Sequence, residues 1–136
     1  MPRKAREPLW LERSILDAIH LDQLREHGGL PGVRDENALE SALARPQNLF
    51  GHGETKEVPV LAAAYAWGIA RNHPYRDGNK RAAFLALAVF AELNGFRFEA
   101  PEEEVVQVML AVADKRCSEA DLVMWVRRSL RKIKAS

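Results

Sequence analysis

The sequence is short of the residues that stabilise secreted and membrane-spanning chains. It has one cysteine, Cys117, so no disulfide can form within the chain. Its 20 Lys and Arg nearly balance 19 Asp and Glu, and a formal net charge of +1 gives no general attraction to nucleic acid or an anionic membrane. The longest apolar run, residues 82–91, is well below the roughly 20 residues that a membrane-spanning helix needs. Any electrostatic specificity must therefore be local.

The start of the chain also lacks the pattern of an export signal. The basic stretch MPRKAREP is not followed by an apolar segment long enough for a signal peptide. We therefore expect a cytoplasmic protein. With 136 residues, 47% of them hydrophobic, and only 7 prolines and 8 glycines, the chain suits one globular domain over residues 1–136. Residues 1–10 are expected to be loosely ordered.

Periodic apolar residues and helix-ending signals predict helix after helix. The predicted helices span residues 12–27, 35–45, 58–72, 79–93, 101–115 and 118–130. Asp35 and Ser118 are expected to cap their helices, whereas Pro46 is expected to end the second one because proline lacks the N–H that a helix interior needs. The stretch 47–58 should be a loop, and FRFEA, residues 96–100, could pair weakly as a strand. The expected fold is an all-α, single compact bundle of six or seven helices.

The third and fourth predicted helices, residues 58–72 and 79–93, are apolar nearly all round. This pattern is typical of buried helices. We expect the two to form a central buried helical hairpin, with the fourth helix pointing its free N–H groups into a cleft beside the connecting loop.

The loop between these helices, within RNHPYRDGNKR, is densely charged. Lys80 and Arg81 fall in the first turn of the following helix, where the helix dipole disfavours a cation by roughly 0.3–1 kcal/mol. A phosphate held by the free N–H groups, these cations and the Asn79 amide would offset that cost. The Asp77-Gly78 pair adds a tight turn that lets the backbone approach such a ligand closely. The pattern therefore indicates a phosphate site.

Taken one at a time, these residues are more often plain helix ends, turn formers and solvated charges. Their order favours another interpretation, because HPYRDGNKR, residues 73–81, resembles the signature of the Fic/Doc family in its Doc-like form. The stretch GGLPGVRDENALESALARPQN, residues 28–48, is similar to the N-terminal part of death-on-curing toxins of type II toxin–antitoxin systems. Tyr75 departs from the family pattern, which usually has Phe there. Its ring can still anchor the loop in the core, but its hydroxyl then needs a partner or access to water.

The resemblance implies an enzyme that moves a phosphate-containing group from a nucleotide to a protein hydroxyl. Family members that attach AMP have Gly before the signature Arg and a second Arg three residues on, where this chain has Lys80 and Phe84. The resemblance therefore favours a Doc-like kinase that transfers the gamma-phosphoryl group of ATP to a Ser or Thr. A translation elongation factor is the suggested target, and arrest of growth is the expected consequence.

The roles of the site residues are implied by the same resemblance. His73 would take the proton of the hydroxyl as general base, and Asp77 would hold Mg²⁺. Arg81 would stabilise the charge that develops on the phosphoryl group. The expected cofactors are ATP and Mg²⁺. The phosphates would be bound by four successive residues, Gly78, Asn79, Lys80 and Arg81.

Inhibition is expected to come from a separate partner. No Ser or Thr of the chain is followed four positions later by the Glu that blocks the nucleotide site in some family members. By resemblance, a cognate antitoxin would inhibit the protein by folding a disordered segment against an apolar groove. The basic stretch RRSLRKIK suits a solvated helix face, so direct binding of nucleic acid is not expected, and neither is binding to a membrane.

Two other functions stay open. One is AMP transfer, which differs from the kinase reaction in whether label from the alpha or the gamma position of ATP reaches the target. The other is a non-catalytic binding module, for which His73→Ala would leave the cellular phenotype unchanged. His20, His27 and His52 lie outside the signature and are expected at the surface or at helix ends.

Overall fold

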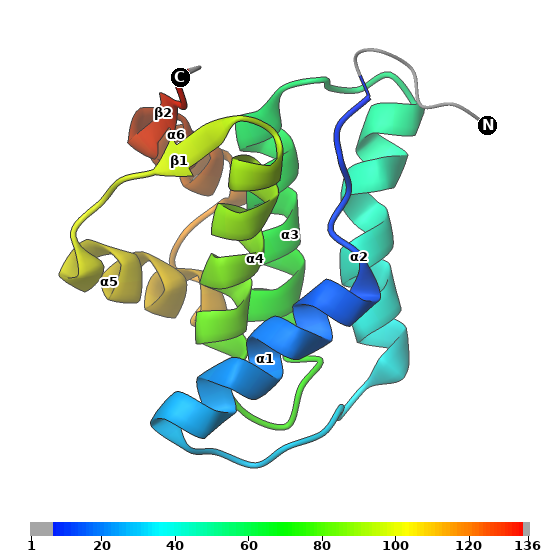
Figure 1. Cartoon of the computed structure of the whole chain (residues 1–136), viewed down its shortest axis with the longest axis vertical. Coiled ribbons are helices and arrows are strands. Elements are labelled where there is room, and N and C mark those ends of the chain that lie inside the picture. The colour runs from blue at the N-terminus through cyan, green and yellow to red at the C-terminus, as the bar shows by residue number, and fades with distance from the viewer. Residues whose placement is uncertain (1–6, 135–136) are drawn as a thin grey trace.

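The computed structural model describes residues 7–134, which fold into a helical bundle (Figure 1). This part of the chain forms six α-helices and two short strands. The all-α prediction is confirmed. Among the described helices, none has the length and apolar character needed to cross a membrane. In chain order the elements are α1 Arg13–His27, α2 Glu36–Gly51, α3 Val58–Asn72, α4 Asn79–Leu93, β1 Phe96–Phe98, α5 Glu102–Ala113, α6 Glu119–Ser129 and β2 Leu130–Lys132.

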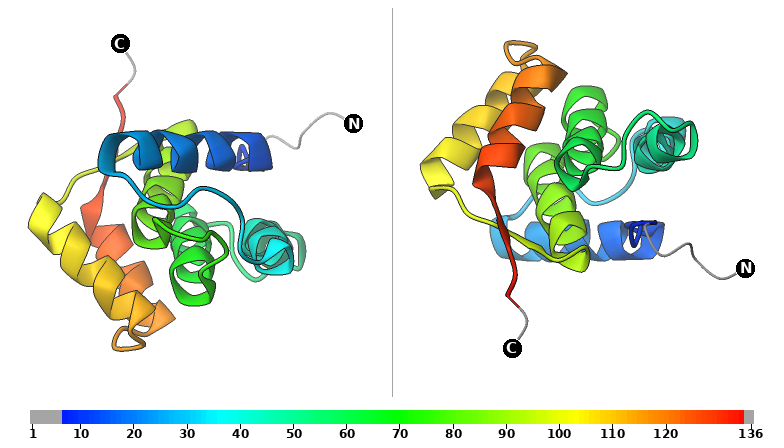
Figure 2. Two further views of the ribbon diagram at one scale, coloured as in Figure 1. Left: turned by 90° about the horizontal axis from the view of Figure 1, so that it is seen from below. Right: turned by 90° about the horizontal axis from the view of Figure 1, so that it is seen from above.

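Helix α3 lies at the centre of the bundle, where it packs against α2, α4 and α6 (Figures 1 and 2). Every residue of 61–70 except Trp67 is buried. Small side chains allow this close packing, because a Cβ added at Gly68 would lie 3.0 Å from the Cβ of Ala42 on α2. The buried hairpin of α3 and α4 that the sequence predicts is confirmed.

The helices begin with the caps that the sequence predicts. Asp35 Oδ1 accepts the N–H of Ala38 at 3.0 Å, and Ser118 Oγ accepts the N–H of Asp121 at 3.1 Å. The predicted bounds of α1, α3, α4 and α6 agree with the structure to within one residue.

Pro46 does not end α2, which corrects the prediction. The helix continues through Pro46 to Gly51, so residues 47–51 are helical rather than part of a loop. Pro46 is buried, and Phe50 in the following turn places its ring 5.6 Å from that of Trp10. Burial of these apolar side chains offsets the one backbone hydrogen bond that the proline removes.

Residues 7–10 are packed against α4. The N–H of Leu9 donates to Asn94 Oδ1 at 2.8 Å, and Asn94 Nδ2 donates to the Leu9 carbonyl at 3.0 Å. The Trp10 ring stacks on Phe90, with centroids 6.0 Å apart. Residues 9 and 10 thus make specific contacts with the end of α4, whereas residues 1–6 lie outside the described part of the chain, and the expected looseness of residues 1–10 stays a prediction.

The weak strand expected at residues 96–100 is present as β1. It pairs antiparallel with β2, with Phe96 opposite Lys132 and Phe98 opposite Leu130. Because the backbone of Leu130 joins this ladder, α6 ends at Ser129, one residue earlier than expected.

Candidate active site

Two loops meet at one end of the central hairpin. The first, which we call the signature loop, is residues 73–78 between α3 and α4. The second, which we call the strap, is residues 28–35 between α1 and α2. Figure 1 shows both at the lower end of the bundle, and Figure 2 shows the strap passing the signature loop when viewed from below.

The strap and the signature loop are bound to each other through their backbones. Val33 and Tyr75 form an antiparallel bridge, and the N–H of Arg76 donates to the Gly32 carbonyl at 3.0 Å. The Pro74 carbonyl accepts two successive backbone N–H groups of the strap, at 2.7 and 3.0 Å. The two stretches of sequence that carry the Fic/Doc resemblance are therefore in direct contact.

A groove of about 730 Å³ opens beside the signature loop. Five of the predicted site residues line it, namely Asp77, Gly78, Asn79, Lys80 and Arg81. The end of α1 and the face of α5 complete the lining. The apolar part of the lining consists of Phe84, Leu85, Ala100, Val105, Val106 and Leu110.

His73 lies at the other end of the signature loop and is not part of this lining. It is the C-cap of α3, is exposed, and has the left-handed backbone angles φ 48° and ψ 60°. Its role as general base stays a prediction.

The carboxylate of Asp77 is oriented by backbone groups. Oδ1 accepts the N–H of Gly78 at 3.1 Å, and Oδ2 accepts the N–H of Leu30 in the strap at 3.2 Å. Gly29 approaches so closely that a Cβ there would lie 3.1 Å from Asp77 Oδ2, and its φ of 128° suits glycine alone. The carboxylate remains exposed on the groove, where its other lone pairs can bind a cation.

The exposed carboxylate oxygens of Asp77 would suit a Mg²⁺ ion that binds together with a nucleotide. Within residues 7–134 there is no group of three or more His, Cys, Asp or Glu side chains that could hold a metal by itself. Mg²⁺ is commonly held by one or two carboxylates, phosphate oxygens and water. Asp77 supplies one such carboxylate on the groove.

The N-terminal end of α4, which is the positive end of the helix dipole, lies at the groove. Gly78, its N-cap, has a φ of 73°, which confirms the predicted tight turn. Lys80 and Arg81 are exposed, and neither forms an ion pair with any acidic side chain in the described part of the chain. Two unpaired cations beside the free N–H groups of a helix start favour a bound anion.

Asn79 has a structural role that the sequence did not indicate. Its side chain is buried, Oδ1 accepts the N–H of Tyr75 at 2.9 Å, and Nδ2 donates to the Tyr75 carbonyl at 2.9 Å. Both ends of the amide therefore close the signature loop onto the start of α4. The contact of this amide with phosphate stays a prediction.

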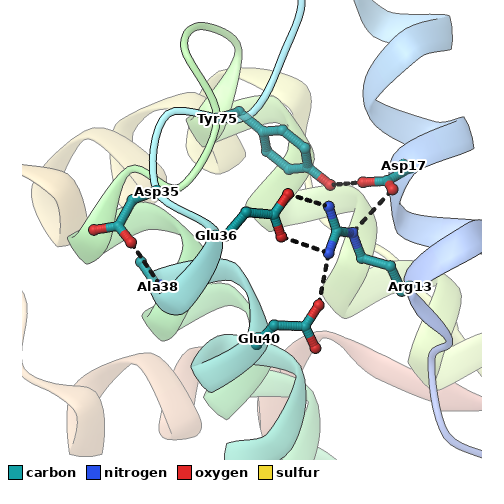
Figure 3. Close-up of polar contacts among 7 residues, drawn as sticks. All are labelled: Arg13, Asp17, Asp35, Glu36, Ala38, Glu40 and Tyr75. Carbon is teal, nitrogen blue, oxygen red and sulfur yellow. Dashed lines mark hydrogen bonds and ion pairs between the residues drawn. The ribbon is translucent and has the colours of Figure 1, made fainter.

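The Tyr75 hydroxyl has the partner that its burial requires. The side chain is 2% exposed, and its hydroxyl donates to Asp17 Oδ1 at 2.8 Å (Figure 3). Asp17 also pairs with Arg13 at 2.9 Å, and Arg13 binds Glu36 and Glu40 of α2. Burial, together with the Asp17 carboxylate, raises the pKa of Tyr75 well above its usual value. The signature loop is thereby tied to α1 and α2.

His20 contacts the site, which corrects the prediction that it lies at the surface or at a helix end. Its side chain is buried, its ring stacks on Tyr75 with centroids 3.7 Å apart, and Nε2 lies 2.8 Å from the Asp77 carbonyl oxygen. A carbonyl can only accept, so Nε2 must carry the proton. The available signal was its spacing, because His20 lies four residues from both Leu16 and Leu24 on the apolar face of α1.

Comparison with known proteins agrees with this geometry. Residues 10–91, more than half of the chain, match the model of the Fic/DOC family. The chain belongs to the Fic/DOC family. In this Fic/DOC chain the matched region includes α1, the strap, the signature loop and most of α4, which together form most of the candidate site.

Two curated relatives support a Doc-like member of the Fic/DOC family. Protein kinase doc of Escherichia phage P1 is 33% identical over 88 residues, which cover 64% of this chain and 70% of that protein. Toxin Doc of Mycolicibacterium smegmatis is 37% identical over 93 residues, which cover 66% of this chain and 72% of that protein. The resemblance that the signature indicated is confirmed.

Proposed function

We propose that this Fic/DOC protein is a Doc-like kinase that transfers the gamma-phosphoryl group of ATP to a Ser or Thr hydroxyl of a cytoplasmic protein. The observation that carries the proposal is the start of α4, where the unpaired Lys80 and Arg81 line the groove beside Asp77. Phe84 lines the same groove at the place where the AMP-transferring branch has a second Arg. The name of the phage P1 relative, a protein kinase, supports the same reaction.

In the proposed reaction the hydroxyl oxygen of the target bonds to the gamma-phosphorus as the bond from that phosphorus to the bridging oxygen breaks. The bonding electron pair stays on ADP, and the hydroxyl proton passes to the His73 imidazole. Lys80, Arg81 and the N–H groups at the start of α4 stabilise the charge on the phosphoryl oxygens. Mg²⁺, held by Asp77 and phosphate oxygens, would neutralise part of the nucleotide charge. The products are a phosphoprotein and ADP.

The proposal extends to the consequence and to a partner. A relative named Toxin Doc supports a toxin whose activity arrests growth, with a translation elongation factor as the target to test first. The apolar lining of the groove includes Val106, which is 56% exposed. A disordered segment of a cognate antitoxin, folding as an amphipathic helix on this lining, would cover the groove and stop the reaction.

Intact-mass analysis of a purified translation elongation factor, incubated with the protein, ATP and Mg²⁺, tests the reaction. We expect a gain of one phosphate. His73→Ala should slow the transfer by about 10²–10⁴-fold, the usual effect of losing a general base. His52→Ala is the matched control, because His52 is exposed at the end of α2, and should leave the rate unchanged.

The same measurement separates the other candidate functions. A gain of one adenylate in place of one phosphate would show AMP transfer and contradict the kinase proposal. Growth arrest that persists undiminished in His73→Ala would indicate a binding module that needs no catalysis.

A further inference from the structure

The side chain of Arg34 binds the end of α3 next to the proposed general base. Its Nε donates to the carbonyl of His73 and its Nη2 to the carbonyl of Asn72, each at 2.7 Å. Its backbone N–H donates to the following carbonyl, that of Pro74, also at 2.7 Å. This single residue of the strap thus binds three successive carbonyls where α3 meets the signature loop.

The backbone conformation of His73 explains why such support is needed. With φ 48° and ψ 60°, His73 lies in the left-handed region that residues with a Cβ rarely adopt. The helix itself contributes the bond from the His73 N–H to the Ile69 carbonyl, which at 3.2 Å is at the long end of the normal range. A conformation of this kind persists only where its surroundings hold it. It also sets the direction in which the imidazole leaves the backbone.

Arg34 is itself held in place by the start of α2. Its neighbour Asp35 is the N-cap of α2 and accepts the N–H of Ala38 at 3.0 Å (Figure 3). The backbone N–H of Asp35 donates to the Pro74 carbonyl at 3.0 Å. The guanidinium of Arg34 therefore extends from a fixed point toward the two carbonyls.

The guanidinium suits this position better than another cation would. Its planar set of donors can bind two neighbouring carbonyls at once, and its positive charge is favourable at the C-terminal end of a helix. Lysine would keep the charge but lose the paired donors of fixed geometry. These two contacts therefore require the guanidinium of an arginine, because a positive charge alone would not supply both hydrogen bonds.

We propose that Arg34 is a positioning residue for His73, holding it in the left-handed conformation that directs its imidazole toward the hydroxyl of the protein substrate. This inference rests on the proposed function, in which His73 takes the proton. The guanidinium of Arg34 donates to the carbonyls of His73 and Asn72, and Arg34 is not part of the groove lining, so its proposed action passes through His73. If Arg34 only capped α3, its substitution would lower the stability of the protein, and its effect on the transfer rate would be the same with and without His73.

The test is a double-substitution cycle read by transfer of label from gamma-labelled ATP. We expect Arg34→Gln and Arg34→Lys each to slow the transfer by about tenfold to a hundredfold, the effect of misplacing a catalytic group by about 1 Å. The affinity for a non-hydrolysable ATP analogue with Mg²⁺, measured by calorimetry, should not change. In the His73→Ala background, Arg34→Gln should cause no further loss.

Three results would each overturn the proposal. They are a full rate in Arg34→Lys, a weakened affinity for the nucleotide analogue, and an equal loss from Arg34→Gln with and without His73. If Arg34→Gln does not fold, the proposal is tested by NMR on the wild-type protein. A scalar coupling between Arg34 Nε and the His73 carbonyl carbon, transmitted through the hydrogen bond to the carbonyl oxygen, should then be observed by NMR, and its absence would also overturn the inference.

Failure of this inference can be distinguished from failure of the proposed function. The wild-type protein alone tests whether phosphate is transferred. The cycle between Arg34 and His73 can also be read by growth arrest or by label from the alpha position of ATP, since any reaction in which His73 takes the proton depends on its orientation. The two proposals can therefore fail separately.

Discussion

His20 and Asn79 bind the backbone of the signature loop from two different elements, His20 from α1 and Asn79 from the start of α4. His20 reaches the Asp77 carbonyl, and Asn79 bonds both backbone groups of Tyr75. Buried polar side chains that satisfy buried backbone groups make a loop rigid, because breaking such a contact leaves a donor or acceptor unpaired. At this scale the precision of the site depends on residues that need not touch the substrate.

Two substitutions of His20 separate the effect of its ring from the effect of its N–H donor. His20→Phe keeps a ring to stack on Tyr75 but leaves the Asp77 carbonyl without this donor, whereas His20→Gln keeps an N–H donor without the ring. Because the lost hydrogen bond should loosen the loop, we expect faster amide hydrogen exchange of residues 76–79 in His20→Phe than in His20→Gln. His52→Phe, at an exposed position, is the control and should not change this exchange. Equal exchange in both His20 variants would contradict the role of the donor.

At the scale of elements, the close contact of α2 with α3 fixes the end of the strap that leads into α2. A Cβ added at Gly68 of α3 would lie 3.0 Å from the Cβ and 3.2 Å from the Cα of Ala42, so the helix backbone itself is the obstacle. Asp35, the N-cap of α2, is the last residue of the strap, and its N–H donates to the Pro74 carbonyl of the signature loop. A shift of α2 would therefore move the strap.

Gly68→Ala tests this contact. The steric cost of about 1–3 kcal/mol should exceed the gain of up to about 1 kcal/mol that alanine brings to a helix, so we expect a lower free energy of unfolding. Gly51→Ala is the matched control, because apart from its chain neighbours and its own helix backbone no atom of residues 7–134 lies within 4 Å of its added Cβ, and it should leave stability equal or slightly higher. Denaturant unfolding measures both. A Gly68→Ala protein as stable as the control would show that α2 moves away at no cost.

At the scale of the whole molecule, both tyrosines of the chain are buried and join elements that are distant in sequence. The Tyr65 hydroxyl on α3 accepts the N–H of Leu11 at 3.1 Å, and the Tyr75 hydroxyl donates to Asp17. Burial raises the pKa of Tyr65 to about 12 and raises that of Tyr75 further. The unfolded chain therefore releases these protons at a lower pH than the folded protein does.

This difference predicts a loss of stability at alkaline pH. Below pH of about 10, the ordinary tyrosine pKa, both states are protonated and the contribution of the tyrosines is constant. Above it, the unfolded chain loses protons that the folded protein retains, so the free energy of unfolding falls as pH rises. Tyr75→Phe should show a smaller fall, because only Tyr65 then contributes. Denaturant unfolding on either side of pH 10 measures the slopes, and equal slopes would contradict the shifted pKa of Tyr75.

Much of the site could be predicted from the sequence, and the remainder could not. The signature loop, its place between two buried helices, and the grouping of residues 77–81 at a helix start follow from local patterns, and the structure places all of 77–81 on one groove. The helical continuation through Pro46 and the packing of residues 7–10 depend on which apolar surfaces are available to cover them. Such surfaces exist only once the helices are assembled.

The sequence by itself determined the helices, because apolar periodicity and caps act between residues a few positions apart. Tertiary structure decided which side chains support the loop that carries His73 and Asp77. The contact of His20 with Asp77 joins positions 57 apart, and that of Arg34 with His73 joins positions 39 apart. No local pattern specifies contacts over such separations, since they depend on how α1, α2 and α3 pack around one another.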